Sequence, residues 1–152
     1  MIDPTDKRIL SLLQKDARMP LAEVARRCGL ALTTVHRRFQ KLQDSGVIRG
    51  FSLDLDPAAI GLGVTAFAHI RQRYRSAMEI DYAELIAMPE VEEIHSVVGD
   101  FDLLVKLRAR NNAHVLEILK RIYPIAGVTR SATVICLVTR LERPTLIEAA
   151  AD

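Results

Sequence analysis

The chain has 152 residues, of which 49% are apolar and 26% are charged, as is typical of a folded globular protein and not of a disordered one. Its longest run without a charged side chain, residues 57–70, is 14 residues long, whereas a membrane-spanning helix needs about 20. Charges within the first ten residues also argue against a signal peptide. We therefore expect a cytoplasmic protein with no membrane partner.

The small net charge of +2 conceals an uneven distribution along the chain. Residues 1–50 contain ten Lys or Arg against five Asp or Glu, a net charge of +5. Residues 51–152 contain eleven against fourteen, a net charge of −3. The concentration of positive charge in the N-terminal third indicates that this third contacts a polyanion.

Three short helices are predicted in this N-terminal third. The first begins at Asp3-Pro4, where a capping side chain precedes a proline at the first helical position. The second begins after Pro20 and ends at Gly29, which tolerates the left-handed backbone of a sharp turn. The third runs from Leu32 to Asp44, and Val47–Phe51 is predicted to leave it as a strand, as in a winged helix.

The third helix carries the candidate DNA contacts. Its predicted buried stripe consists of Leu32, Val35, Phe39 and Leu42. A tight helix–turn–helix with a basic second helix can enter the groove of double-stranded DNA. We expect base-edge contacts from Thr33, Thr34, His36 and Arg37, and phosphate contacts from Arg38 and Lys41. The alternative is an ordinary solvated cationic face.

From residue 63 onward the pattern changes to alternating strands and helices. Strands are predicted at 64–71, 91–98, 101–108 and 129–138, and helices at 81–88 and 112–123. The order βαββαβ predicts a ferredoxin-like domain, an antiparallel sheet with both helices on one face. Apolar residues expected on both faces of the sheet are Val64, Ala66, Ala68, Val105, Leu107, Val134 and Cys136. An apolar open face predicts a homodimer.

The predicted fold is therefore α+β with two domains. A winged helix–turn–helix domain spans residues 1–50, and a linker strand and turn span 51–62. The linker is short, and its exposed strand could pair with a partner chain. Residues 63–152 form the ferredoxin-like domain.

Long, ordered motifs along the chain resemble the Lrp/AsnC (feast/famine) family of transcription regulators. The N-terminal motifs are Asp3-x-x-Asp6-x-x-Ile9-Leu10, Leu13-Gln14-x-Asp16-Ala17-Arg18, Leu21-Ala22-Glu23-Val24-Ala25, Gly29-Leu30, Val35-x-Arg37-Arg38-Phe39-x-x-Leu42 and Gly46-Val47-Ile48-x-Gly50-Phe51. The C-terminal motifs are Pro89-Glu90-Val91, Gly99-Asp100-Phe101-Asp102-Leu103-Leu104 and Gly127-Val128-Thr129-x-Ser131 to Leu137. The family usually has serine where this chain has Ala31, so we expect Thr33 or Thr34 to cap a slightly later helix start.

The resemblance implies a ligand-sensing C-terminal domain. Members of the family form dimers, which often assemble into octamers, and bind an amino acid or related small molecule between dimers. The candidate effector site is Gly99, Asp100, Phe101 and Asp102. An amino acid needs an anion for its ammonium group, which Asp100 or Asp102 could supply, and backbone N–H donors for its carboxylate. The alternative is an ordinary turn, because turns favour Gly and Asp.

Other functions have weaker support in the sequence. The same two-domain layout resembles that of sirohaem decarboxylases, but Arg49-Gly50-Phe51-Ser52 follows the regulator pattern. A hetero-assembling protein with degenerate DNA contacts is a third possibility. The four histidines lack metal-ligand spacing, and no cofactor motif occurs, so we expect no metal and no cofactor. Cys28 and Cys136 are expected to be buried, reduced thiols.

Overall fold

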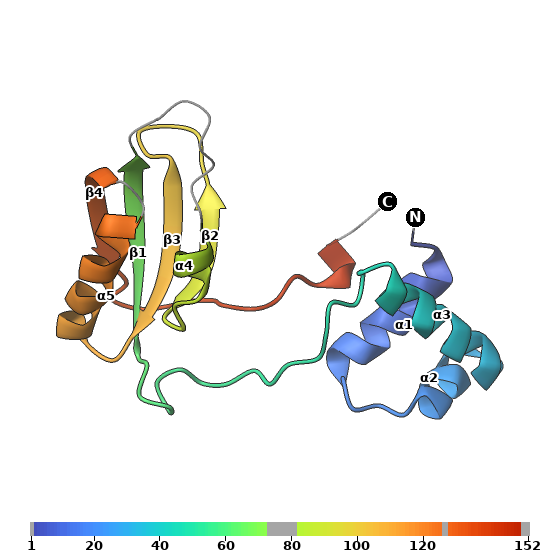
Figure 1. Ribbon diagram of the computed structural model, residues 1–152. Coiled ribbons are helices and arrows are strands. Elements are labelled where there is room, and N and C mark those ends of the chain that lie inside the picture. Colours follow the sequence, from blue (N-terminus) through green and yellow to red (C-terminus); the bar gives the residue numbers. More distant parts are fainter. Residues whose placement is uncertain (1, 73–81, 126–127, 150–152) are drawn as a thin grey trace. The chain divides into compact units, whose positions relative to one another are not determined.

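The computed structural model describes residues 2–72, 82–125 and 128–149 (Figure 1). The chain divides into two compact units, which are described separately. A helical unit contains residues 1–53 together with 142–152, and a sheet unit contains residues 54–141. The predicted C-terminal domain is 63–152, whereas in the structure the described residues 142–149 group with the helical unit.

The helical unit contains α1 (Pro4–Lys15), α2 (Leu21–Cys28) and α3 (Leu32–Asp44). The predicted start of α1 is confirmed. The Asp3 carboxylate accepts a hydrogen bond from Asp6 N at 2.8 Å, and the Asp6 side chain accepts one from Asp3 N at 3.4 Å. This reciprocal cap satisfies two backbone donors that a helix start otherwise leaves open. Gly29 has a φ of 68°, which provides the predicted turn between α2 and α3.

The core of the helical unit is small. Its buried members are Ile9, Leu13, Val24, Ala25 and Val35. Phe39 packs against them and Leu42 is also buried, but Leu32 is 43% exposed, so the predicted stripe is wrong at that position. Leu32 is the first residue of α3, where no preceding helical turn covers it.

The predicted wing strand is also wrong. Residues 47–51 form no strand in the structure. Instead, Ile48 N donates to Leu42 O at 3.0 Å, which closes the end of α3. The following residues, 49–56, have no regular secondary structure.

The sheet unit confirms the ferredoxin-like prediction. Its elements are β1 (Val64–Gln72), α4 (Ala83–Ile86), β2 (Val91–Ser96), β3 (Leu103–Ala109), α5 (Asn112–Ile125) and β4 (Val128–Ile135). The strands lie in the order β2-β3-β1-β4 and every pair is antiparallel. Helices α4 and α5 cover the same face (Figure 1). The predicted helix at 81–88 is shorter than expected within the described residues, and Asp81 lies outside them.

Strand register assigns the side chains to two faces. The face covered by the helices holds Val64, Ala66, Ala68, Val105 and Leu107. Of the residues predicted to make both faces apolar, only Val134 and Cys136 lie on the open face. They share it with Phe67 and Leu104, but also with Lys106 and Arg108. The open face therefore carries both apolar and charged side chains. Side chains alternate between the two faces along each strand, so the apolar residues that pack against the helices are absent from the open face.

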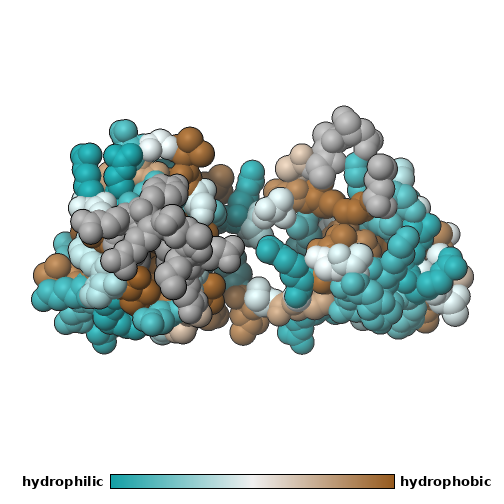
Figure 2. Space-filling model, turned by 45° about the horizontal axis from the view of Figure 1, so that its top comes forward, coloured by the Kyte–Doolittle hydropathy of each residue, from teal (hydrophilic) through white to brown (hydrophobic). Residues whose placement is uncertain are grey.

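Hydrophilic side chains cover much of the visible surface of each unit, and apolar side chains are interspersed among them (Figure 2). Exposed apolar residues include Leu53, Leu55 and Leu137. Within residues 2–72, 82–125 and 128–149, the helices are too short or too polar to span a membrane.

Candidate functional site

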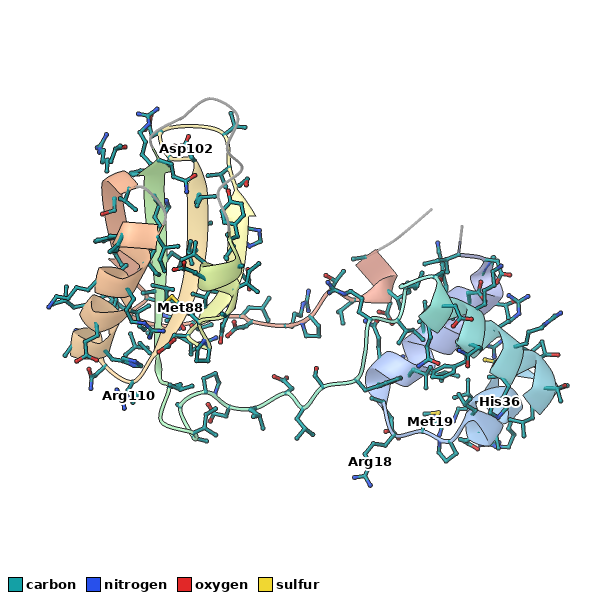
Figure 3. All side chains as sticks on the ribbon, in the orientation of Figure 1. Arg18, Met19, His36, Met88, Asp102 and Arg110 are labelled. Carbon is teal, nitrogen blue, oxygen red and sulfur yellow. The ribbon has the colours of Figure 1, made fainter. Side chains whose placement is uncertain are left out.

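Helix α3 presents a polar outer face opposite its buried residues. Thr33, Arg37 and Lys41 follow one another at intervals of four residues, so they form a stripe along the helix, and each is exposed. His36 is exposed beside this stripe, whereas Thr34 is half-buried at its border. Four of the six predicted DNA-contacting residues therefore share an accessible face. Figure 3 labels His36 on this helix.

The first turn of α3 is uncapped by any side chain. Ala31 occupies the N-cap position, and its carbonyl accepts hydrogen bonds from Thr34 N at 3.0 Å and Val35 N at 3.2 Å. The predicted later start with a threonine cap is therefore wrong. Thr33 and Thr34 lie inside the helix, so their hydroxyls are not used as the cap.

Arg38, a predicted phosphate contact, is paired in the structure with two carboxylates of the helical unit. Its Nη1 donates to Asp6 Oδ1 at 2.8 Å and to Asp3 Oδ2 at 2.5 Å, and its side chain is only 28% exposed. These carboxylates raise the pKa of Arg38 above its already high normal value. The backbone N–H of Asp6, together with Arg38, lowers the pKa of Asp3. Arg38 therefore joins α3 to the start of α1.

The arginines of α2 are also neutralised within the helical unit. Glu23 accepts hydrogen bonds from Arg26 Nη2 at 2.6 Å and from Arg27 Nε at 2.7 Å. Those two guanidinium groups lower the pKa of Glu23 to about 2. In contrast, Arg37 and Lys41 have no carboxylate partner in the described part of the chain. Their positive charge is available to a ligand.

A shallow depression follows the outer face of α3. It is lined by Arg37, Gln40, Lys41, Asp44 and Ser45. Gln40 was not among the predicted contacts, although its position three residues after Arg37 and one before Lys41 could have indicated it. Its amide donates to Asp44 Oδ1 at 2.9 Å. The depression thus combines positive charge with an amide that can both donate and accept hydrogen bonds.

The predicted effector residues lie between β2 and β3, and their two carboxylates differ. Asp102 Oδ2 accepts a hydrogen bond from Gln72 N at 2.8 Å, and Asp102 N donates to Ile70 O at 2.9 Å. These bonds fix the loop to the end of β1, where Figure 3 labels Asp102. Asp100 is exposed and has no hydrogen-bond or ion-pair partner among the residues that the structure describes. Of the two carboxylates, Asp100 is the more available to an ammonium group.

Phe101 packs on the open face of the sheet. Its ring meets the His69 ring edge-on, with centroids 5.4 Å apart, and Arg130 Cζ lies 5.6 Å from its centroid. Arg130 in β4 and His69 in β1 therefore belong to the surroundings of the loop, although only Phe101 was predicted. Gly99, at the start of the loop, has a φ of 144° that disfavours other residues.

The remaining predictions concern metals and thiols. In the described ranges, no group of three or more His, Cys, Asp or Glu side chains is arranged to hold a metal ion. Cys28 and Cys136 are free thiols, and both are half-buried and not buried as expected.

Comparison with known families identifies both units. A family model described as "Winged helix-turn-helix DNA-binding" matches residues 2–49. A second, described as "Lrp/AsnC ligand binding domain", matches residues 65–146, more than half of the chain. This chain belongs to the Lrp/AsnC family. It is accordingly a DNA-binding transcription regulator, and the family assignment excludes the sirohaem decarboxylase alternative.

Individual Lrp/AsnC proteins support this assignment. The HTH-type transcriptional regulator FL11 of Pyrococcus furiosus is 35% identical over 137 residues, which cover 90% of each chain. The feast or famine regulatory protein of M. tuberculosis, solved with L-methionine, is 30% identical with a TM-score of 0.86, over 96% of this chain and 99% of that one. A Neisseria meningitidis transcriptional regulator, solved with L-Met, is 25% identical with a TM-score of 0.84, over 96% of each chain.

Proposed function

We propose that this Lrp/AsnC regulator binds a specific DNA sequence as a homodimer through the outer face of α3, and that an amino acid modulates the binding. The observation that carries the DNA part is the contrast between adjacent arginines. Arg38 is held by Asp3 and Asp6, whereas Arg37 and Lys41 face outward without an acidic partner in the described residues.

The side chains on the outer face of α3 would differ in their DNA contacts according to their chemistry. Arg37 has the fork of donors that suits a guanine edge, and His36 and Thr33 flank it on the exposed side. Lys41 supplies a point charge for a phosphate, which positions the protein without selecting sequence. Arg38 positions α3 from inside the unit, and Thr34 lies at the border of the accessible face.

The open face of the sheet supports a homodimer. Phe67 and Val134 are cross-strand partners on this face, and Val134 is 55% exposed. Burying such a pair against a second copy removes apolar surface from water. A two-fold axis would then bring two α3 helices to successive major grooves, about 34 Å apart. Such dimers would assemble further into octamers, as the family resemblance implies.

An amino acid is the proposed class of effector, and L-methionine is the first candidate because two related structures contain it. Asp100 would bind the ammonium group, and backbone N–H groups near Gly99 would bind the carboxylate. An effector alters the affinity for DNA only if its own affinity differs between the free protein and the DNA-bound protein. Acting on DNA, the protein would work in the cytoplasm, as expected from the sequence.

A binding titration with the DNA upstream of the protein's own gene tests the proposal. We expect a sequence-selective complex whose affinity falls steeply as salt rises, because phosphate neutralisation releases counterions. Addition of L-methionine, and of each other amino acid in turn, should change that affinity for at least one of them. A complex that forms equally with scrambled DNA, or that never forms, would favour the hetero-assembling partner protein instead.

A further inference from the structure

Residues 142–149, which we name the C-terminal strap, return from the sheet unit to the helical unit. The chain therefore passes between the units twice, at residues 53–54 and again at residues 141–142. The strap ends in the short helix η1 (Ile147–Ala149), which lies beside α1 (Figure 1). The proposed function leaves this second connection unexplained.

One side chain of α1 binds the strap through both of its polar atoms. Gln14 Nε2 donates to Thr145 O at 2.8 Å, and Gln14 Oε1 accepts from Ile147 N at 2.8 Å. One turn earlier on α1, Ser11 Oγ donates to Glu148 Oε1 at 2.9 Å. A glutamine amide donates through its nitrogen and accepts through its oxygen at the same time, so Gln14 satisfies both a carbonyl and an N–H group of the strap backbone.

The strap also contributes apolar contact. Leu146 and Ile147 are half-buried, whereas the residues before them, 137–145, are largely exposed. Two backbone groups and one carboxylate of the strap are thus bound to α1, and two of its apolar side chains are partly removed from water. The contact area is small, but all three hydrogen bonds lie within four residues, Thr145 to Glu148.

We propose that the C-terminal strap is a positioning device that limits the rotation of the helical unit and so sets the affinity for DNA with two half-sites. A unit joined at one point can rotate about its linker, and binding two half-sites must then freeze that rotation. A second attachment removes part of this freedom before DNA is met, and so raises the effective concentration of the second α3 helix at its half-site. The DNA consequence rests on the proposed function, but the contact itself does not.

Amide exchange in the full chain tests the contact without DNA. Gln14→Ala removes both bonds, whereas Thr145→Ala keeps them, because Thr145 uses only its backbone carbonyl. Thr145→Ala is thus the matched control. We expect Ile147 N–H to exchange at least about fivefold faster in Gln14→Ala and unchanged in Thr145→Ala. An Ile147 amide that is unprotected in the native protein, or indifferent to Gln14→Ala, would overturn the strap.

DNA titration of the same variants tests the positioning role. We expect Gln14→Ala to weaken binding to a two-half-site fragment about three- to tenfold and to leave binding to a one-half-site fragment unchanged. Equal loss on both fragments would indicate damage to the helical unit and overturn the role, as would no loss on either. If neither the native protein nor any variant binds DNA, the proposed function fails. The exchange measurement still shows whether Gln14 binds the strap, because it does not depend on DNA.

A chain ending at Leu141 provides a second variant. It lacks the whole strap, and the same loss on two half-sites is expected from it as from Gln14→Ala. Rotational diffusion measured by ¹⁵N relaxation should become faster for residues 4–44 than for the sheet unit in both variants. Unchanged relaxation in both would contradict a restraint.

Discussion

Arg38 and Asp6 form an ion pair across 2.8 Å, between Nη1 of α3 and Oδ1 of α1. Asp6 is only 6% exposed, and it is also a member of the reciprocal cap that begins α1. The same arginine atom reaches Asp3, the other half of that cap. One guanidinium group therefore holds the start of the first helix against the middle of the third.

Arg38→Ala should destabilise the helical unit. It leaves the Oδ1 atom of the buried Asp6 without its donor, and an unpaired buried hydrogen-bonding group costs about 1–3 kcal/mol. A fall in Tm of several degrees is expected by circular dichroism, with no change in the salt dependence of DNA binding. Arg37→Ala is the matched control, since it removes the same charge from an exposed position and should leave Tm unaltered. A stable Arg38→Ala protein with a shallower salt slope would restore the phosphate role.

Arg37→Ala and Lys41→Ala should weaken DNA binding in different ways. Loss of a bidentate base contact costs about 1–3 kcal/mol and relaxes sequence preference. Loss of a phosphate contact weakens all sequences alike and reduces the slope of log K against log salt by about 1. Titrations on cognate and scrambled DNA at several salt concentrations separate the two. Identical behaviour of the two variants would contradict the division of roles.

Stability should fall at acid pH partly through Glu23. Arg26 and Arg27 lower its pKa from 4.5 in the unfolded chain to about 2 in the folded one. The contribution of this carboxylate is therefore complete above pH 4.5 and is lost as pH falls from 4.5 towards 2. Asp3, whose pKa is also lowered, acts in the same direction.

Glu23→Gln should accordingly flatten the dependence of Tm on pH between 5 and 2. The difference from the native protein should be small and should shrink in high salt, because the pair is exposed. Thermal melts at low and high salt provide the measurement. Parallel curves for variant and native protein at low salt would mean that the carboxylate has no stabilising partner in solution.

Asp100→Asn should abolish an amino-acid-induced rise in Tm without lowering the Tm of the free protein. Asp102→Asn should lower the Tm of the free protein and keep part of the amino-acid response, because it replaces the charged acceptor for Gln72 N at the end of β1 by a weaker, neutral one. A thermal-shift titration with L-methionine compares them. If Asp100→Asn responds like the native protein, the ammonium group is bound elsewhere.

Val134→Asp should weaken self-association. Val134 lies on the open face, so a carboxylate there would have to be buried at the proposed dimer interface. Leu116→Asp, on α5, is the matched control, because Leu116 is 54% exposed and Val134 is 55% exposed. Light scattering after size-exclusion chromatography should report monomers only for Val134→Asp. Monomers only for Leu116→Asp would indicate that the dimer interface lies on the helix-covered side.

The sequence by itself determined the order of elements and the fold class. Asp3-Pro4 starts α1, Gly29 ends α2, and the alternation of strands and helices after residue 63 produces the ferredoxin-like topology. These signals are local, since caps, turns and periodicity depend on residues within a few positions of one another. Element ends were less accurate, as at α4, and the wing strand was wrong because a strand requires a pairing partner that no local pattern specifies.

Only the tertiary structure decided which side chains are free to act. Arg37 and Arg38 are adjacent, but one step along a helix turns the side chain by about 100°, so one faces outward and the other meets Asp3 and Asp6, which are 35 and 32 residues away. Asp100 and Asp102 are likewise equivalent candidates in the sequence, but in the structure the carboxylate of Asp102 accepts a hydrogen bond from Gln72 N. The attachment of residues 142–149 to Gln14 joins positions more than 130 residues apart. Partners so distant in sequence come together only through folding. Their contacts determine which charged side chains are paired within the protein and which remain available to a ligand.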